Sequence, residues 1–393
     1  YEEVITPVVE HYELLAAKIG EENRKRMYVF EDLGGRKVAL RPEFTASVAR
    51  LVATKMRYDP KPIRLFCVGT LYRYDEPQSG RYREFWQANY ELIGSDRPEA
   101  DAEILALTGN LMESLNLSNC RFKIGHVGIL RSILTQEGIK EERQNVIMEL
   151  LDRKKQDKAL QFLEEIGGSR GCINVLRNLI AIRGGEPEGV IQEIREVVKG
   201  YGMALTAAEN LRDILNLMRS REVKFEMSVE AGFARGLEYY TGMIFEAFIP
   251  EISVALGGGG RYDRLIELFG GESTPAVGVA LGMDRFILGM EKQGVTLPKD
   301  AKKRVLVVPV VDEVRGEAFE VSLRLRRAGI HTEVEVMGRS VSKALSDASR
   351  RDLTHVIIVG PKELEEGKIV LRDMEKQKQK TLSIQEALEE IDN

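Results

Sequence analysis

The chain has 393 residues and a mass of 44.3 kDa, a length that predicts two or three domains with sizeable cores. Its formal net charge of −5 excludes a chain-wide basic field, so any nucleic-acid contact has to be a local patch. The three widely spaced cysteines and four histidines form no disulfide framework, CxxC pair or HExxH motif. This usage favours a reducing cytoplasm and no structural zinc. No apolar run reaches the roughly 18 residues of a membrane-spanning helix, so we expect no membrane partner.

The N-terminal region predicts short β-elements. Residues 1–10 read as an apolar strand that Pro7 interrupts, and Gly34 with Gly35 predicts a hairpin turn between two apolar runs. The sequence begins at Tyr1 rather than at a methionine, so we expect its natural N-terminus to lie upstream.

Glu43 and Thr45 stand where the sequence changes from a strand pattern to a helix pattern. A carboxylate in the first turn of a helix is stabilised by the helix dipole, which is a common structural role. A contact to a ligand is the alternative role for Glu43. The sequence alone leaves the two equally open.

The strongest local signal lies between Phe66 and Gly94. Two aromatic-rich runs flank a polar turn at residues 75–80 that contains Pro77 and Ser79, which is typical of a β-hairpin with a longer loop. Side chains alternate along a strand, so one face of the second strand should carry four polar side chains. These are Arg83, Gln87, Asn89 and Glu91. Burying such groups without partners costs about 1–3 kcal/mol each, so they face either a polar ligand or solvent.

Two further stretches predict helices. Residues 96–115 form a helix that opens with acids such as Asp101, and residues 140–221 carry helical periodicity throughout. Thr206 and Glu209 have the spacing of a capping box. The many charges in this second stretch favour a solvated face, with a nucleic-acid-binding patch as the alternative.

A second dense block contains an evident strand at Met243–Glu246 and a run of glycines at 257–260. The glycine run predicts a tight loop before a helix, where the backbone can approach a ligand closely. It matches neither GxxxxGK[ST] nor GxGxxG, which excludes a P-loop and a dinucleotide fingerprint. Residues 275–286 predict a strand and then a helix with Arg285 in its first turn. That arginine either clamps a phosphate or pairs with Asp284 on the surface.

The C-terminal part changes character. Residues 291–303 are polar, contain Gly294 and Pro298, and predict a linker. Residues 304–393 alternate between strand and helix patterns in the order βαβαβ, followed by another strand and a helix, which predicts a small α/β domain.

Several of these segments resemble one enzyme family. Arg73, the charged loop and Gly80-Arg81-Tyr82-Arg83-Glu84-Phe85 resemble motif 2 of class II aminoacyl-tRNA synthetases. The stretches RGLEYY at 235–240 and GGGGRYD at 257–263 resemble both signatures specific to histidyl-tRNA synthetases. This pairing is highly specific, and the resemblance covers essentially the whole chain.

The other motifs follow in the order of that family. Residues 1–10 resemble the tail of motif 1, and LRPEFTAS at 40–47 resembles the segment that holds the substrate amino group. Residues 275–286 resemble motif 3, and 304–393 resemble the anticodon-binding domain of histidyl, prolyl, threonyl and glycyl synthetases. One departure is Asp75, at an acidic position where the family usually has Glu.

The resemblance implies an α/β fold with an α+β catalytic domain, built on the antiparallel sheet of class II synthetases. It implies a helical insertion and a small C-terminal α/β domain of the anticodon-binding type. The expected boundaries are 1–139 and 222–290 for the catalytic domain, 140–221 for the insertion, 291–303 for the linker and 304–393 for the C-terminal domain.

The function implied is that of a histidine–tRNA ligase in cytoplasmic protein synthesis. Such an enzyme uses ATP to convert L-histidine to histidyl-adenylate and transfers the histidyl group to tRNA(His). The resemblance further implies Mg²⁺ bound with ATP, no zinc, no organic cofactor and no metal held by protein side chains alone. It also implies a homodimer formed through the motif 1 region.

The site residues are carried over position by position. Arg73 and Arg235 are the expected catalytic residues, because guanidinium groups stay charged and bind phosphate oxygens in pairs. The expected histidine-binding residues are Glu43, Thr45, Gln87, Glu91, Tyr239, Tyr240 and Tyr262. The expected ATP-binding residues are Arg73, Asp75, Arg81, Tyr82, Phe85 and Arg285.

One alternative belongs to a different functional class. A catalytically silent paralogue that senses histidine, as the regulatory subunit of ATP phosphoribosyltransferase does, borrows the same fold. Such modules typically lack the anticodon-binding domain and lose the arginines. Here Arg73, Arg235 and Arg285 are all present, and so is the C-terminal domain, which favours the enzyme.

Overall fold

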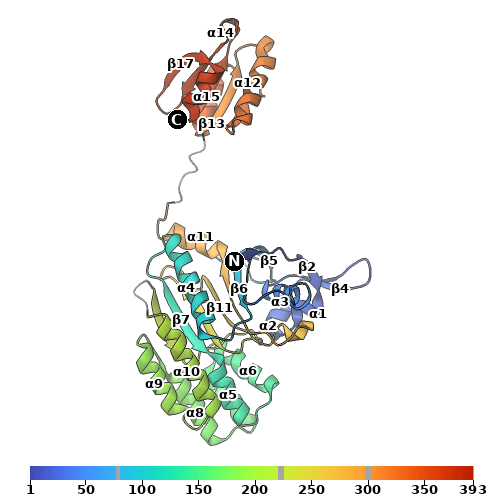
Figure 1. Cartoon of the computed structure of the whole chain (residues 1–393), viewed down its shortest axis with the longest axis vertical. Helices are drawn as coiled ribbons and strands as arrows, with labels where there is room; N and C mark the ends of the chain where they lie inside the picture. The colour runs from blue at the N-terminus through green and yellow to red at the C-terminus, as the bar shows by residue number, and fades with distance from the viewer. Residues whose placement is uncertain (77–79, 220–224, 297–302, 393) are drawn as a thin grey trace. The chain divides into compact units, whose positions relative to one another are not determined.

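The computed structural model describes residues 1–76, 80–219, 225–296 and 303–392. The chain forms two compact units, Tyr1–Thr296 and Leu297–Asn393 (Figure 1). Three features expected from the sequence fall partly outside the described residues. These are Pro77 and Ser79 of the hairpin turn, residues 220–221 at the end of the insertion, and residues 297–302 of the linker, which include Pro298.

The first unit is built on a nine-stranded sheet in the order β1-β5-β6-β12-β11-β10-β7-β9-β8. The strands from β5 to β7 pair antiparallel, whereas β1 with β5 and β7 with β9 pair parallel. Their bounds are β1 Glu2–Glu3, β5 Ile63–Tyr72, β6 Glu84–Ile93, β7 Arg121–His126, β8 Arg183–Gly184, β9 Glu226–Glu230, β10 Met243–Phe248, β11 Gly257–Arg261 and β12 Ala276–Gly282. The expected fold class, α/β with a large antiparallel sheet, is confirmed.

The predicted hairpin is also confirmed. Strands β5 and β6 pair over ten residues each, from Ile63 opposite Ile93 to Tyr72 opposite Glu84. A separate three-stranded sheet in the order β2-β4-β3 lies at the N-terminus, and its turn at Gly34 and Gly35 is the second predicted hairpin. Its bounds are β2 Val9–His11, β3 Val29–Glu31 and β4 Lys37–Leu40.

Helices cover this unit, and those between β7 and β9 gather together in Figure 1. The bounds are α1 Tyr12–Ala16, α2 Glu21–Lys25, α3 Thr45–Thr54, α4 Pro98–Ser114, α5 Val127–Gln136, α6 Glu141–Asp152, α7 Gln156–Glu165, α8 Arg170–Ala181, α9 Pro187–Val197, α10 Gly202–Leu217 and α11 Met283–Lys292, with a 3-10 turn at Glu267–Phe269. One apolar core runs from β7 and β10 through α4, α5 and α10 into α6–α9. The helical segment is therefore packed as part of the first unit.

Two local predictions were wrong. The glycine run at 257–260 is not a loop before a helix; it is strand β11, paired on both sides by β10 and β12 and followed only by a 3-10 turn. The capping box at Thr206 is also absent. Helix α10 begins at Gly202, and the Thr206 hydroxyl donates to the Gly202 carbonyl inside the helix, while Glu209 pairs with Arg195.

The second unit is a five-stranded sheet in the order β14-β13-β15-β16-β17, parallel in its first three strands and antiparallel in the rest. Apolar clusters on its two faces pack under helices on both sides. The bounds are β13 Arg304–Pro309, α12 Arg315–Arg327, β14 His331–Val334, α13 Val341–Arg350, β15 His355–Val359, α14 Pro361–Glu365, β16 Lys368–Asp373, β17 Lys378–Ser383 and α15 Ile384–Asp392, with a 3-10 turn at Asp312–Val314. The sequence analysis missed α14 and β17. None of the helices in the described parts of the chain is long and apolar enough to cross a bilayer.

Candidate active site

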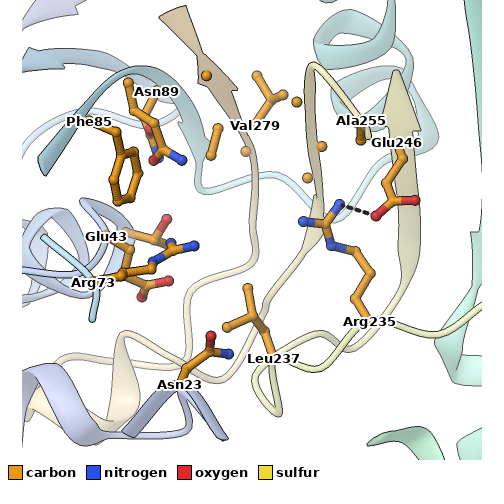
Figure 2. Close-up of a pocket in the computed structure, with 18 of the residues that line it drawn as sticks. Asn23, Glu43, Arg73, Phe85, Asn89, Arg235, Leu237, Glu246, Ala255 and Val279 are labelled. Carbon is orange, nitrogen blue, oxygen red and sulfur yellow. Dashed lines mark ion pairs between the residues drawn. The ribbon is translucent and has the colours of Figure 1, made fainter. Parts of the chain in front are cut away.

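A pocket with a cavity volume of about 330 Å³ opens on the large sheet of the first unit. Figure 2 shows Glu43 and Arg73 on one side of it and Arg235 with Glu246 on the other. All the site residues expected from the sequence line this one pocket. They are Glu43, Thr45, Arg73, Asp75, Arg81, Tyr82, Phe85, Gln87, Glu91, Arg235, Tyr239, Tyr240, Tyr262 and Arg285.

Glu91 lies on β6 and is only 1% exposed. The Thr45 hydroxyl donates to its Oε1 at 2.9 Å, and the Tyr262 hydroxyl donates to its Oε2 at 2.5 Å. Burial raises the pKa of Glu91 to about 7, against these two hydrogen bonds, which lower it. Gly278 on the neighbouring strand β12 leaves room for the carboxylate, because a Cβ there would lie 1.7 Å from Oε2.

Glu43 is a second buried carboxylate in the same pocket. It precedes α3, and its Oε2 accepts a hydrogen bond from the Tyr239 hydroxyl at 3.0 Å. Burial raises the pKa of Glu43, while the Arg73 guanidinium, the Tyr239 hydroxyl and the Ala46 backbone amide oppose that shift. The amide contact means that Glu43 also stabilises the start of α3, so the two roles left open by the sequence are compatible.

Arg73 follows the end of β5 and is fixed from two sides. Its Nε donates to the Pro42 carbonyl at 2.9 Å, and its guanidinium lies 5.3 Å from the centre of the Phe85 ring. Burial lowers the pKa of Arg73, and Glu43 partly offsets the effect. The guanidinium is therefore held between Pro42, which precedes Glu43, and Phe85 on β6.

Arg235 approaches from the loop after β9. Its Nη1 donates to the Phe245 carbonyl at 3.0 Å and lies 3.7 Å from Glu246, which also pairs with Lys123 at 2.8 Å. A Cβ at Gly258 on β11 would lie 2.0 Å from that Nη1. The glycine strand thus leaves the space that the Arg235 guanidinium occupies.

Arg285, in the first turn of α11, is anchored by two backbone carbonyls. Its Nε donates to Gly80 at 3.0 Å and its Nη1 donates to Ala255 at 2.7 Å. Burial lowers its pKa, and the positive charges of Arg81 and Arg73 lower it further. Cations that repel one another in a pocket are the arrangement expected where an anion binds.

Two family models together match most of the chain. The family model described as histidyl-tRNA synthetase matches residues 1–286, and the model described as anticodon binding domain matches residues 304–393. The chain belongs to the histidyl-tRNA synthetase family. The histidine–tRNA ligase of Methanocaldococcus jannaschii is 39% identical over 388 residues, which is 98% of this chain and 90% of that protein.

Solved structures of the histidyl-tRNA synthetase family resemble the whole chain as well. The apo histidyl-tRNA synthetase of S. aureus is similar with a TM-score of 0.67 and 25% identity, covering 100% of this chain and 90% of that one. A protein of Bacillus halodurans C titled as an ATP phosphoribosyltransferase regulatory subunit/histidyl-tRNA synthetase gives a TM-score of 0.75 and 25% identity, over 92% and 90%. The predicted family is confirmed.

Some details of the family site differ from the expectations. Arg83 does not line the pocket with Gln87 and Glu91; it precedes β6, donates to the Asp75 carbonyl and lies 4.2 Å from the Tyr74 ring. Asp284 does not form a surface pair with Arg285, because it lines the pocket and accepts a hydrogen bond from the Trp86 amide at 2.9 Å.

Sequence reasoning gave no role to several pocket residues. Asn89 was placed on the correct face of β6 but was not assigned, and Glu246 alternates toward the pocket from β10. Asp152, at the end of α6, reaches the pocket from the helical segment, a contact that no local pattern signals. The Gln87 Oε1 is buried and has no hydrogen-bond partner among the described residues, so this side chain has hydrogen-bonding capacity left within the pocket.

We predict that Gly278→Ala destabilises the first unit by about 1–3 kcal/mol, because the added methyl group overlaps the Glu91 carboxylate. Thermal unfolding monitored by calorimetry would measure the change. Gly189→Ala in α9 is the matched control, since nothing lies within 4 Å of a Cβ there. Adding Glu91→Ala to Gly278→Ala should recover part of the loss; strictly additive effects would contradict the proposed overlap.

Proposed function

We propose that this chain activates L-histidine with ATP and transfers the histidyl group to tRNA(His). The observation that carries the proposal is the division of charge in the pocket. Two buried carboxylates, Glu43 and Glu91, share the pocket with four arginines at positions 73, 81, 235 and 285. A zwitterionic amino acid with a basic side chain and a polyphosphate need these two kinds of group side by side.

The activation step needs no nucleophilic side chain. An oxygen of the histidine carboxylate forms a bond to the α-phosphorus of ATP, the bond from that phosphorus to the bridging oxygen breaks, and pyrophosphate leaves with the electron pair. Negative charge builds up on the α-phosphoryl oxygens, and Arg73 and Arg235, which both line the pocket, are the proposed groups that offset it. Removing one such contact typically costs on the order of 10²–10³ in rate. Catalysis is then positioning and electrostatic stabilisation.

The transfer step uses the adenylate, a mixed anhydride of a carboxylic acid and a phosphate, as the activated acyl donor. A hydroxyl of the terminal ribose of tRNA forms a bond to the carbonyl carbon, the bond from that carbon to the phosphate oxygen breaks, and AMP leaves with the bonding electrons while its phosphate takes up the hydroxyl proton. For ATP itself, Arg285 is proposed to bind the γ-phosphate. Arg81, Tyr82, Phe85 and Asp75 are proposed to line the rest of the nucleotide site, and Asp75 is already held by Arg26 at 3.3 Å.

Histidine selection follows from the hydrogen-bonding capacity of imidazole. The neutral ring has one donor and one acceptor nitrogen, so a selective site must offer one group of each kind. Glu91 is the proposed acceptor and the Tyr240 hydroxyl the proposed donor. Tyr262 orients Glu91, and a site of this type can reject competitors that lack the hydrogen bonds by roughly 10⁴–10⁵.

The backbone groups of histidine have their own proposed partners. Glu43, which accepts from Tyr239, is proposed to bind the α-ammonium group, and the Gln87 side-chain amide is proposed to donate to the carboxylate. Thr45 donates its only proton to Glu91, so it would use an oxygen lone pair to accept from the ammonium group.

Mg²⁺ is proposed to enter together with ATP. Among the described residues no group of three or more His, Cys, Asp or Glu side chains could hold a metal ion. Mg²⁺ usually keeps several waters and binds one or two carboxylates plus substrate phosphates, which suits this pocket. Asp75 and Glu246 line it beside the arginines and would supply such carboxylates. The bound ion would offset phosphate charge.

The proposal includes the organisation of the chain. The catalytic domain would comprise 1–139 and 222–290, with the insertion at 140–221, the linker at 291–303 and the anticodon-binding domain at 304–393. Cytoplasmic protein synthesis is the proposed setting, in keeping with three cysteines that are all unpaired and buried.

The first test is ATP–pyrophosphate exchange with each of the twenty amino acids. We expect exchange that depends on histidine alone, because only histidine offers both imidazole nitrogens to Glu91 and Tyr240. Exchange with another amino acid would contradict the substrate assignment. Histidine binding without any exchange would favour the regulatory paralogue instead.

Tyr240→Phe should raise the KM for histidine about fivefold and change that for ATP little. A lost hydrogen bond is worth about 1 kcal/mol, and about 1.4 kcal/mol corresponds to a factor of ten. Steady-state exchange kinetics would measure both constants. Tyr201→Phe is the matched control, because that buried tyrosine bonds Glu137 in the helical segment. Equal increases in both KM values would remove Tyr240 from the imidazole role.

We further propose a homodimer through the motif 1 region at residues 1–10. Exposed apolar side chains gather there and on the adjoining small sheet, as expected of an interaction surface. They are Ile5, Val8, Val9, Val29, Phe30 and Leu33. Sedimentation analysis should show a dimer that Ile5→Asp weakens and that Met203→Asp, an exposed apolar site in α10, leaves intact. A monomeric parent protein would contradict the proposal.

A further inference from the structure

A buried ion pair lies behind the pocket, between Asp101 and Arg261. Asp101 belongs to the first turn of α4 and is 0% exposed, and the Arg261 side chain at the end of β11 is 6% exposed. The Arg261 Nη2 lies 2.5 Å from Oδ2 of Asp101, and its Nε donates to both carboxylate oxygens at 3.1 Å. Neither side chain lines the pocket.

Further bonds fix the Arg261 guanidinium. Its Nη1 donates to the Ser95 carbonyl at 2.9 Å and to Asp263 Oδ1 at 3.2 Å, and its Nη2 donates to the Arg97 carbonyl at 3.4 Å. The Arg261 guanidinium therefore joins the start of α4 to the end of β11, and each of its three nitrogens donates at least one hydrogen bond.

Tyr262 follows Arg261 directly, so its position depends on this anchor. The Tyr262 amide donates to the Ala276 carbonyl at 2.7 Å, and its hydroxyl donates to Glu91 at 2.5 Å. A shift of Arg261 would move the hydroxyl that orients the Glu91 carboxylate.

The same network reaches Tyr240 from the other side. Thr241 follows Tyr240, and its hydroxyl donates to Asp263 Oδ2 at 2.9 Å while accepting from the Asp263 amide at 3.1 Å. The Thr241 amide donates to the Arg261 carbonyl at 2.8 Å. Tyr240 and Tyr262 are thus held in register by these three hydrogen bonds between their chain neighbours, none of which lines the pocket.

Stability alone is a weak explanation for this pair. Desolvating two charges often costs as much as their attraction returns, and apolar replacements of buried ion pairs are often neutral or stabilising. The hydrogen bonds of Arg261 have fixed directions. They tie its side chain to α4, to the loop before α4 and to Asp263, and an apolar contact would not fix these positions.

We propose that Asp101, Arg261, Asp263 and Thr241 are positioning residues that set the distance between the Tyr240 hydroxyl and the Glu91 carboxylate. They act through Tyr240 and Tyr262 and determine the affinity for histidine. Arg73 and Arg285 are anchored instead by the carbonyls of Pro42, Gly80 and Ala255, so we expect the affinity for ATP to depend little on this network. The inference rests on the proposed function, since it takes histidine as the ligand of that end of the pocket.

The test uses two variants of the full chain, Thr241→Val and Asp101→Asn. Histidine affinity is measured by titration calorimetry and the KM values by pyrophosphate exchange. We expect the Kd and KM for histidine to rise about threefold to tenfold in Thr241→Val and more in Asp101→Asn, with the KM for ATP within twofold of the parent. Thr108→Val is the matched control, because that buried threonine of α4 bonds only the Ile104 carbonyl.

The outcomes separate this inference from the proposed function. A parent protein that binds histidine without exchange would contradict the function, and calorimetry would still decide the inference. Lower thermal stability with unchanged histidine affinity would overturn it, as would equal losses for histidine and ATP. If Asp101→Asn does not fold, Thr241→Val decides alone, since it removes one hydroxyl and leaves the ion pair intact.

Discussion

A carboxylate buried in the middle of a large sheet is the constraint on which the rest of the site depends. Glu91 has almost no contact with water, so its charge has to be compensated by neighbouring groups. Thr45 from α3 and Tyr262 from the end of β11 donate to it, and Gly278 on β12 leaves it room. Elements far apart in the sequence are therefore required at fixed positions around one side chain.

Glycines of strand β11 leave room for a charged side chain at the other end of the pocket, as Gly278 does for Glu91. Glycine weakens a strand because it has high backbone entropy and no side chain to pack. Here β10 and β12 pair with the strand on both sides, and the missing side chains leave space for the Arg235 guanidinium and for the backbone of β12. Pairing with β10 and β12 offsets the low strand propensity of the glycines. The resulting strand lines the pocket with backbone atoms that a ligand can approach closely.

The sequence predicted the elements with strong local patterns and missed those without. The alternation in 66–94 indicated β5 and β6, and the helical periodicity indicated α6–α10. The glycines of β11 have no strand propensity, and the polar, exposed residues of β17 show no apolar alternation, so neither was found. The site residues were named through motif resemblance, because their convergence depends on sheet order. Asp101 looked like an ordinary helix-opening acid until its burial against Arg261 was visible.

The groups that hold the pocket side chains in place form two sets. One set holds residues proposed to select the amino acid, and the other holds arginines proposed to bind ATP. Glu91, Tyr240 and Tyr262 depend on the start of α3 and on the network of Asp101 and Arg261. Arg73 and Arg285 depend on backbone carbonyls at Pro42, Gly80 and Ala255. Because the two groups of residues rest on different anchors, changes around Glu91 and Tyr240 need not displace Arg73 and Arg285, the arginines that we propose to bind phosphate. A fold organised in this way can refine which amino acid it accepts while the charge arrangement for adenylation stays in place.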